Sequence, residues 1–426
     1  MIVRGRPYGQ PLIVSISRMQ KKQIHTFVLP NGLRVMLLPD KGEVSYCGLF
    51  MGVGTRDELV GEHGYAHLTE HMLFKATQRR TAAQIINRLE AVGGELNAYT
   101  TKEETVVYAL SLRRDMARAI ELVADVCLNV RFLPDNLSKE TEVVMDEIDS
   151  YLDSPADSIV DDFEDAIFSG YTIGRNILGT KQSLENVTVD SLQAFYDRTY
   201  TPDSQLLFLM GDVSLQQAEK WAYRYFSGHT GVRNYTREVP SNYHPCTLQV
   251  TKNTSQAHCL LGGRAIDAYS PMRYASALLN NILGGNGANS RLNMALRERH
   301  ALVYQVESQV VSYSDTGVWS IYLGTDHADL KRALRLVRIE LDKMCQKPLT
   351  DKQLDAAKRQ MLAQLIIASE NKEAWILNTA KQYFLYGKLA DYAQIEQKIN
   401  AITAQQLMQV AEQYFAPQNL SQLVFK

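Results

Sequence analysis

The second half of the chain repeats the first half. Residues 273–283 can be laid on residues 64–74 without a gap, and a tyrosine and an alanine recur at the second and third positions of both stretches. Two more pairs of segments repeat in the same order, with residues 332–337 resembling 118–123 and residues 349–351 resembling 133–135. A duplication of this length predicts two homologous domains, and 426 residues suffice for two hydrophobic cores.

The expected fold class is α+β. Strand patterns, the turn signal Asn31-Gly32 and segments of helical period indicate that the domains combine strands and helices. We expect each domain to contain an antiparallel-rich β-sheet with helices packed on one face. We place the N-terminal domain at residues 24–226, a Pro- and Gly-containing linker at 227–245, and the C-terminal domain at 246–426. Residues 1–23 carry five basic side chains and no acidic one, and we interpret them as a disordered leader.

The first copy of the repeat contains His67-Leu68-Thr69-Glu70-His71. Residues four positions apart lie on the same face of a helix, so His67 and His71 can converge on one ion while Glu70 lies beside them. A catalytic zinc takes three protein ligands and leaves a position for water, whose proton a carboxylate can accept. The pattern therefore predicts two zinc ligands and a base, although two histidines on a helix can also be exposed or simply packed.

A third ligand can come from the helix predicted at residues 138–152. Glu140, Val144 and Glu147 follow helical spacing on one face, and a carboxylate on a buried face needs a partner such as a metal ion. We nominate Glu147 as the third ligand and Glu140 as a neighbour of the histidines or of the water. The alternative is that both are solvent-exposed helix charges.

The second copy lacks all of these groups. Ser276, Leu279 and Asn280 stand where the first copy has His67, Glu70 and His71, and residues 356–363 contain no glutamate. Because the duplicated fold does without them, a purely structural role for the first copy's residues is less favoured.

Composition excludes several other functions. The net charge is −2, from 45 Lys and Arg against 47 Asp and Glu, so a nucleic-acid partner is not expected. The five cysteines are scattered and no apolar run is long enough for a membrane span, which favours a reduced, cytoplasmic protein without a membrane partner.

The motif and the following glutamate resemble the pitrilysin (insulinase) family of zinc peptidases, in the half-length subfamily of mitochondrial processing peptidase subunits and bacterial homologues. The resemblance implies that His67, His71 and Glu147 bind one Zn²⁺ per chain and that Glu70 is the catalytic base. Glu140 matches an additional glutamate of the family, seven positions before the ligand.

Two further stretches carry the resemblance. Residues 96–105 resemble the edge strand on which the family binds its substrate, with the backbone of Asn97 and Ala98 holding the peptide. In the second half, Arg297 and Tyr304 resemble a pair that contacts the substrate and its carbonyl across the cleft. The alternatives are an ordinary core strand, a surface arginine and a core tyrosine.

The resemblance implies a zinc endopeptidase that cleaves unfolded peptides or processes a peptide precursor inside a closed chamber, the chain being half of a clamshell. Because one chain carries both the zinc residues and the Arg-Tyr pair, a homodimer is expected, with a heterodimer of homologous subunits as the competitor. The short loop at residues 284–289 favours general peptide cleavage over presequence processing. The alternative is a non-catalytic structural subunit, a role that this fold has in the respiratory bc1 complex.

Overall fold

Asn31 and Gly32 reverse the chain between its first two strands, as the sequence predicts, and Gly32 has a φ of +92°. The computed structural model describes residues 24–426, so the predicted leader lies outside the described residues. The first sheet has the order β1-β2-β6-β3-β5-β4, and its neighbours are antiparallel except for the parallel pair β2–β6. Its strands are β1 (His25–Val28), β2 (Arg34–Pro39), β3 (Val44–Met51), β4 (Glu95–Thr100), β5 (Thr105–Leu112) and β6 (Gln205–Gly211).

The second sheet repeats this topology with one strand fewer. Its order is β7-β11-β8-β10-β9, and again one parallel pair, β7–β11, is followed by antiparallel neighbours. Its strands are β7 (Thr247–Val250), β8 (Ala257–Ala265), β9 (Val303–Ser312), β10 (Gly317–Thr325) and β11 (Ser421–Phe425). The predicted α+β fold with two related, antiparallel-rich sheets is therefore confirmed.

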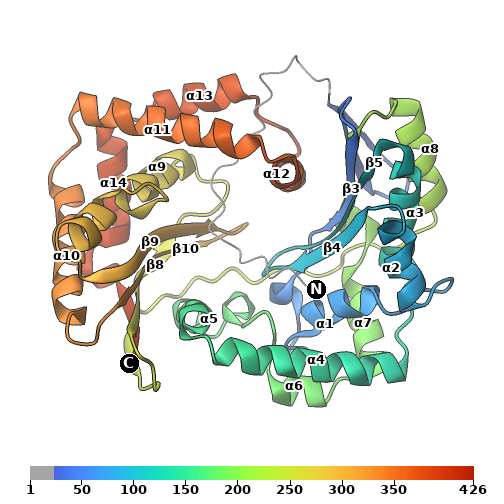
Figure 1. Ribbon diagram of the computed structural model, residues 1–426, viewed down its shortest axis with the longest axis horizontal. Helices are drawn as coiled ribbons and strands as arrows, with labels where there is room; N and C mark the ends of the chain where they lie inside the picture. The colour runs from blue at the N-terminus through green and yellow to red at the C-terminus, as the bar shows by residue number, and fades with distance from the viewer. Residues whose placement is uncertain (1–23) are drawn as a thin grey trace.

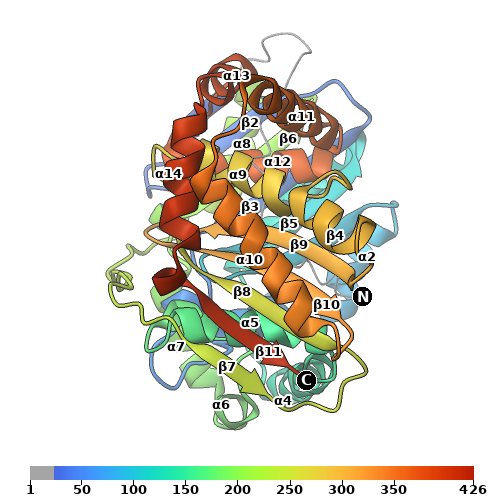
Figure 2. The same cartoon turned by 90° about the vertical axis from the view of Figure 1, so that its left-hand side faces the viewer.

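Helices from the same half cover one face of each sheet (Figures 1 and 2). In the first half α3 packs on β3 and β5, and in the second half α9 packs on β9 and α14 on β8. The helices of the first half are α1 (Tyr65–Leu73), α2 (Ala82–Glu90), α3 (Met116–Leu128), α4 (Pro134–Leu152), α5 (Pro155–Ile167), α6 (Lys181–Glu185), α7 (Val189–Thr199) and α8 (Leu215–Phe226). Those of the second half are α9 (Arg273–Gly284), α10 (Leu330–Gln346), α11 (Asp351–Ser369), α12 (Lys372–Tyr386), α13 (Tyr392–Asn400) and α14 (Ala404–Phe415).

The other face of each sheet is covered by a helix from the opposite half. Helix α12 buries Trp375 and Ile376 in a cluster with Phe208 and other residues of the first sheet, and Figure 1 shows α12 beside that sheet. Helix α5 similarly buries Phe163 with Leu260 of the second sheet. This exchange of helices binds the two halves to each other, and the sequence did not predict it.

Residues 227–246, which include the predicted linker, contain no helix or strand. Several of their side chains are nevertheless held firmly, since Arg237 binds Asp57 of the first half at 2.7 Å. The exact domain boundaries at 24–226, 227–245 and 246–426 stay a prediction. Among residues 24–426, no helix is both long and apolar enough to cross a membrane.

Candidate active site

Helix α1 carries the His-x-x-Glu-His motif and begins at a fixed point. Gly64 precedes it in a left-handed conformation with a φ of +89°, and the buried carboxylate of Glu58 accepts N–H bonds from Gly64 at 3.2 Å and Ala66 at 2.9 Å. These bonds satisfy donors that a helix start leaves without a partner. The helix spans residues 65–73 and contains the whole motif.

The side chains of His67, His71 and Glu147 converge. Each residue offers one possible ligand atom, and these three atoms all lie within 4.8 Å of one another. Within residues 24–426, no other three or more His, Cys, Asp or Glu side chains come together in this way. Oε2 of Glu147 lies 3.8 Å from Nε2 of His67 and 3.7 Å from Nε2 of His71. Helix α4 packs against α1, which brings the third predicted ligand to the two histidines.

The group fits a zinc ion. Nε2 of His71, the ring nitrogen near Glu147, is buried and has no hydrogen-bond partner, although a buried imidazole nitrogen normally finds one. Burial lowers the pKa of His67 to about 3, with the charge of His71 as a smaller cause, so His67 is neutral at pH 7 and has a free lone pair. Two imidazoles and one carboxylate are a common ligand set for catalytic zinc.

Glu140 contacts His71 and Lys75. Its Oε2 lies 3.2 Å from Nδ1 of His71, and its Oε1 lies 2.7 Å from Nζ of Lys75. Burial by itself would raise the pKa of Glu140, but the hydrogen bonds and charges of His71 and Lys75 outweigh it and hold this pKa below its usual range. A charged Glu140 that accepts the Nδ1 proton of His71 leaves Nε2 of that ring directed at Glu147.

Glu70 lies three residues after His67 and directly before His71, and it is only 5% exposed. The hydroxyl of Thr100, the last residue of β4, donates to Oε2 of Glu70 at 2.5 Å. Burial raises the pKa of Glu70 to about 7, although the Thr100 hydrogen bond and the charge of His71 act in the opposite direction. A carboxyl group with this pKa can both take up and release a proton near neutral pH.

Asn97 and Ala98 lie on β4, at the edge of the first sheet. They pair with Tyr108 and Val107 of β5 on one side, and β4 packs beside α1. The opposite backbone edge of β4 has no neighbouring strand within the described part of the chain. The predicted strand-addition residues thus lie on the strand that also provides Thr100.

Arg297 and Tyr304 are not brought to this site within one chain. Both are exposed, Arg297 in a π-helical turn at Asn293–Glu298 and Tyr304 on β9, the edge strand of the second sheet. The Tyr304 hydroxyl donates to Asp326 at 3.1 Å, in the same half of the chain. The alternative of a core position for Tyr304 is wrong, because 59% of this residue is exposed.

Three residues near the site were not predicted, namely Glu58, Lys75 and Thr100. Lys75 follows the motif by four residues, so helical spacing could have suggested that it lies near His71. Thr100 and Glu58 contact α1 from other segments, and no local pattern marks such contacts.

A two-sheet α+β fold with a His-x-x-Glu-His helix and a glutamate from a later helix is typical of the inverzincin class of zinc peptidases. Residues 34–181 match the family model described as "Insulinase (Peptidase family M16)", and residues 186–361 match the model described as "Peptidase M16 inactive domain". The chain belongs to the peptidase M16 (insulinase) family, as the resemblance predicts.

Its relatives include two bacterial proteins, each called an uncharacterized zinc protease. The protein of Mycobacterium leprae is 33% identical, with 90% of this chain and 88% of that protein covered, and YmxG of Bacillus subtilis is 31% identical, with 92% and 96% covered. A crystal structure of a protease from Helicobacter pylori has the same fold, with a TM-score of 0.86, 22% identity, and 95% and 99% of the two chains covered. A peptidase M16 inactive domain from Pseudomonas fluorescens is equally similar, with a TM-score of 0.86, 21% identity, and 95% and 97% covered.

Proposed function

We propose that this chain is a zinc-dependent endopeptidase that hydrolyses unfolded peptides or processes a peptide precursor. The observation that carries the proposal is the convergence of His67, His71 and Glu147 beside Glu70, with a buried ring nitrogen of His71 that has no protein partner. The names of the relatives, each an uncharacterized zinc protease, support the same activity.

His67, His71 and Glu147 would hold one zinc ion per chain. Zinc, when bound, supplies a Lewis acid that polarises a carbonyl and lowers the pKa of water. Glu70 takes the proton from the attacking water and later gives it to the leaving amine, while Thr100 holds the Glu70 carboxylate in place. The free edge of β4 at Asn97 and Ala98 binds the peptide as an added strand, which selects extended, unfolded substrates.

The test is metal analysis of the purified protein together with a digest of mixed peptides that is analysed by mass spectrometry. The proposal predicts about one zinc per chain and cleavage within peptides, which a chelator abolishes and added zinc restores. Protein that binds no zinc and leaves the peptides intact would instead favour a non-catalytic subunit of the same fold.

We further infer that two chains cooperate. Arg297 and Tyr304 are exposed in the second half, and the Tyr304 hydroxyl binds Asp326 of the same half, so a second copy could present them across a shared chamber. In such a homodimer Tyr304 would donate a hydrogen bond to the oxygen that becomes negative during hydrolysis. A different, homologous partner chain could present the same residues, and subunit mixing distinguishes the two assemblies.

A further inference from the structure

Residues 101–104 form the turn between β4 and β5, and they directly follow Thr100, which binds Glu70. Three consecutive charged side chains in this turn, Lys102, Glu103 and Glu104, each bind a different element. None of these three residues has a part in the catalytic steps described above. Burying a charged group costs several kcal/mol unless a partner offsets it, so three such groups in one short turn call for a physical explanation.

Lys102 connects the turn to α5. This residue is 4% exposed, and its Nζ lies 3.3 Å from Asp161 and 3.6 Å from Glu164, while it donates to the carbonyl of Arg175 at 2.5 Å. Helix α5 packs on the second sheet, and Glu164 also accepts a hydrogen bond from Tyr313 of the second half at 3.1 Å. Lys102 therefore links the turn to the helix that lies on the second sheet.

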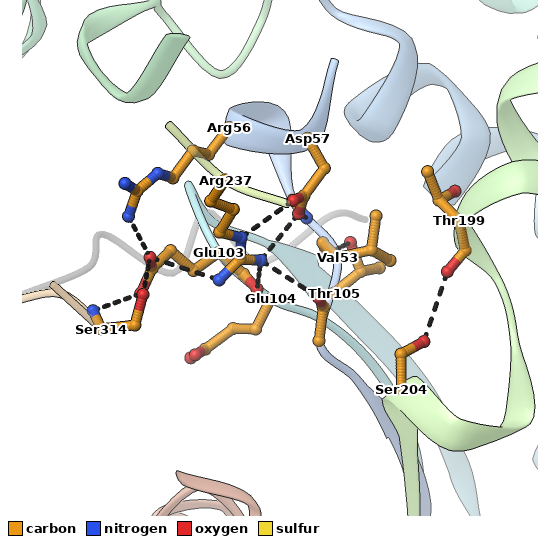
Figure 3. A network of polar contacts seen from close by, with 12 residues as sticks. Val53, Arg56, Asp57, Glu103, Glu104, Thr105, Thr199, Ser204, Arg237 and Ser314 are labelled. Carbon is orange, nitrogen blue, oxygen red and sulfur yellow. Dashed lines mark hydrogen bonds and ion pairs between the residues drawn. The ribbon is translucent and has the colours of Figure 1, made fainter. Parts of the chain in front are cut away.

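Glu103 connects the turn to the second half directly (Figure 3). Its carboxylate accepts from the backbone N–H of Ser314 at 2.8 Å and from the Ser314 hydroxyl at 2.6 Å. It also lies 2.6 Å from Arg56 and 3.2 Å from Arg237 of residues 227–246, and Arg56 pairs with Asp315 at 2.6 Å. One carboxylate thus joins the first half, the connecting segment and the turn between β9 and β10.

Glu104 connects the turn to α12. This residue is 3% exposed, and its Oε1 lies 2.8 Å from Nζ of Lys381. Lys381 belongs to α12, the helix of the second half that packs on the first sheet. The backbone of the turn is held equally tightly. Thr55 and Arg56 donate N–H bonds to the carbonyls of Thr101 and Lys102 at 3.2 and 2.9 Å.

We propose that residues 101–104 couple the placement of the second half to the active site, with Glu103 as a positioning residue that acts on Glu70 through Thr100. A shift of the β9–β10 turn or of α12 moves the end of β4, and with it the Thr100 hydroxyl and the peptide-binding edge. The peptidase is then fully competent only when the two halves are correctly placed. This inference rests on the proposed function for its effect on turnover.

A double-mutant cycle tests the coupling. Glu103→Gln keeps the shape of the side chain and removes its charge, and we expect kcat per bound zinc to fall roughly tenfold, since small misplacements of catalytic groups have effects of this size or larger. In a Thr100→Val background, which already lacks the link to Glu70, the same change should lower kcat less than twofold. An equal fold-change in both backgrounds, or no change in either, overturns the proposal.

Hydrogen exchange provides a readout that needs no turnover. Deuterium uptake by the backbone of residues 95–100 should be faster in Glu103→Gln than in the wild type, while uptake by α3 stays the same. The matched control is Glu121→Gln. The Glu121 carboxylate is also largely buried and lies 2.7 Å from Arg80, but it does not belong to the turn at residues 101–104. This control should change neither kcat nor uptake at residues 95–100.

The two proposals fail in different ways. A zinc-loaded wild type that cleaves no peptide contradicts the proposed function, and the exchange experiment then decides the coupling alone. Unchanged exchange at residues 95–100 in Glu103→Gln, or the same acceleration in Glu121→Gln, overturns the coupling even if the protein is an active peptidase.

Discussion

Glu70 is buried beside two imidazoles, yet its proposed chemistry requires a charged carboxylate. Its pKa of about 7 lies above the ordinary value of 4.5, mainly because of burial. A carboxyl group with a raised pKa in the folded protein binds its proton more tightly when folded than when unfolded. Stability should therefore fall as the pH rises from about 4.5 through 7, because the folded state must then bury the charge.

We predict that Glu70→Gln stabilises the metal-free protein increasingly as the pH rises. The amide fills a similar volume and never becomes charged, so the gain in free energy of unfolding should grow by about 2 kcal/mol between pH 5.5 and pH 8.5. Urea unfolding of both proteins in the presence of a chelator measures this difference. A difference that is constant with pH would show that the Glu70 carboxylate is not desolvated in the folded protein.

Glu140 is the residue that orients His71. Glu140→Ala removes the acceptor of the Nδ1 proton and should lower zinc affinity about 10- to 100-fold without abolishing binding, as is usual for partners of metal ligands. Competition with a chromophoric chelator measures the affinity. Glu142→Ala, at an exposed position of the same helix, is the matched control and should bind zinc like the wild type. Equal affinities in both variants would contradict the assigned role of Glu140.

At the residue scale, helical spacing was enough to predict which side chains share a face of their helix. His67 and His71 share a face of α1, and Glu140 and Glu147 share the face of α4 that packs on it. Thr100 could not be predicted as a partner of Glu70, because the contact depends on how β4 lies against α1. Contacts between distant segments follow from tertiary packing, which no local pattern encodes.

At the scale of the element, the start of α1 depends on Gly64. Its φ is +89°, and a Cβ atom there would lie 2.7 Å from the carbonyl oxygen of Leu178. Gly61 has a similar φ of +91° but nothing within 4 Å of an added Cβ. The two glycines therefore separate the effect of backbone conformation from the effect of a steric clash.

We predict that Gly64→Ala destabilises the protein by at least about 1 kcal/mol more than Gly61→Ala does. Both substitutions place alanine in a left-handed conformation, which costs roughly 1–2 kcal/mol, but Gly64→Ala also forces α1 away from residue 178. Denaturant unfolding of the two variants and the wild type measures the difference. Equal losses would mean that the close contact at Gly64 relaxes freely.

Periodicity largely predicts where strands and helices occur. It predicts less well where each element ends and which sheet each helix packs on. The hairpin at residues 31–32 follows its turn residues, whereas α4 begins at Pro134 rather than at Ser138, since proline is accepted in the first turn of a helix. The packing of α5 and α12 on the sheets of the opposite halves was not predicted. An apolar helix face does not by itself mark which of two sheets it will cover.

At the scale of the whole molecule, the duplicated sequence correctly predicts two related sheets. The two halves are joined by α5, α12 and the buried ion pairs around Glu103, so they should unfold together rather than separately. The zinc group and the Arg297–Tyr304 pair lie in different halves. Their separation is the reason to expect a second chain at each active site.

Subunit mixing tests this expectation. Glu70→Gln and Arg297→Ala should each be nearly inactive, but a mixed dimer would have one site that joins an intact zinc group to an intact Arg-Tyr pair. Under random exchange half of the dimers are mixed and each has one functional site of two, so activity should recover to roughly a quarter of wild type. A mixture that demonstrably exchanges subunits but stays inactive would favour a site within one chain or a different partner chain.

The zinc content and peptide turnover of Glu70→Gln, measured on the same preparation, test the central claim most directly. Glu70 is the base in the proposed mechanism and is not a ligand, and its amide variant cannot accept a proton from water. We predict zinc equal to that of the wild type, with cleavage of mixed peptides lowered at least about a hundredfold. A variant that keeps its zinc and cleaves peptides at the wild-type rate would contradict the assignment of Glu70 and the mechanism built on it.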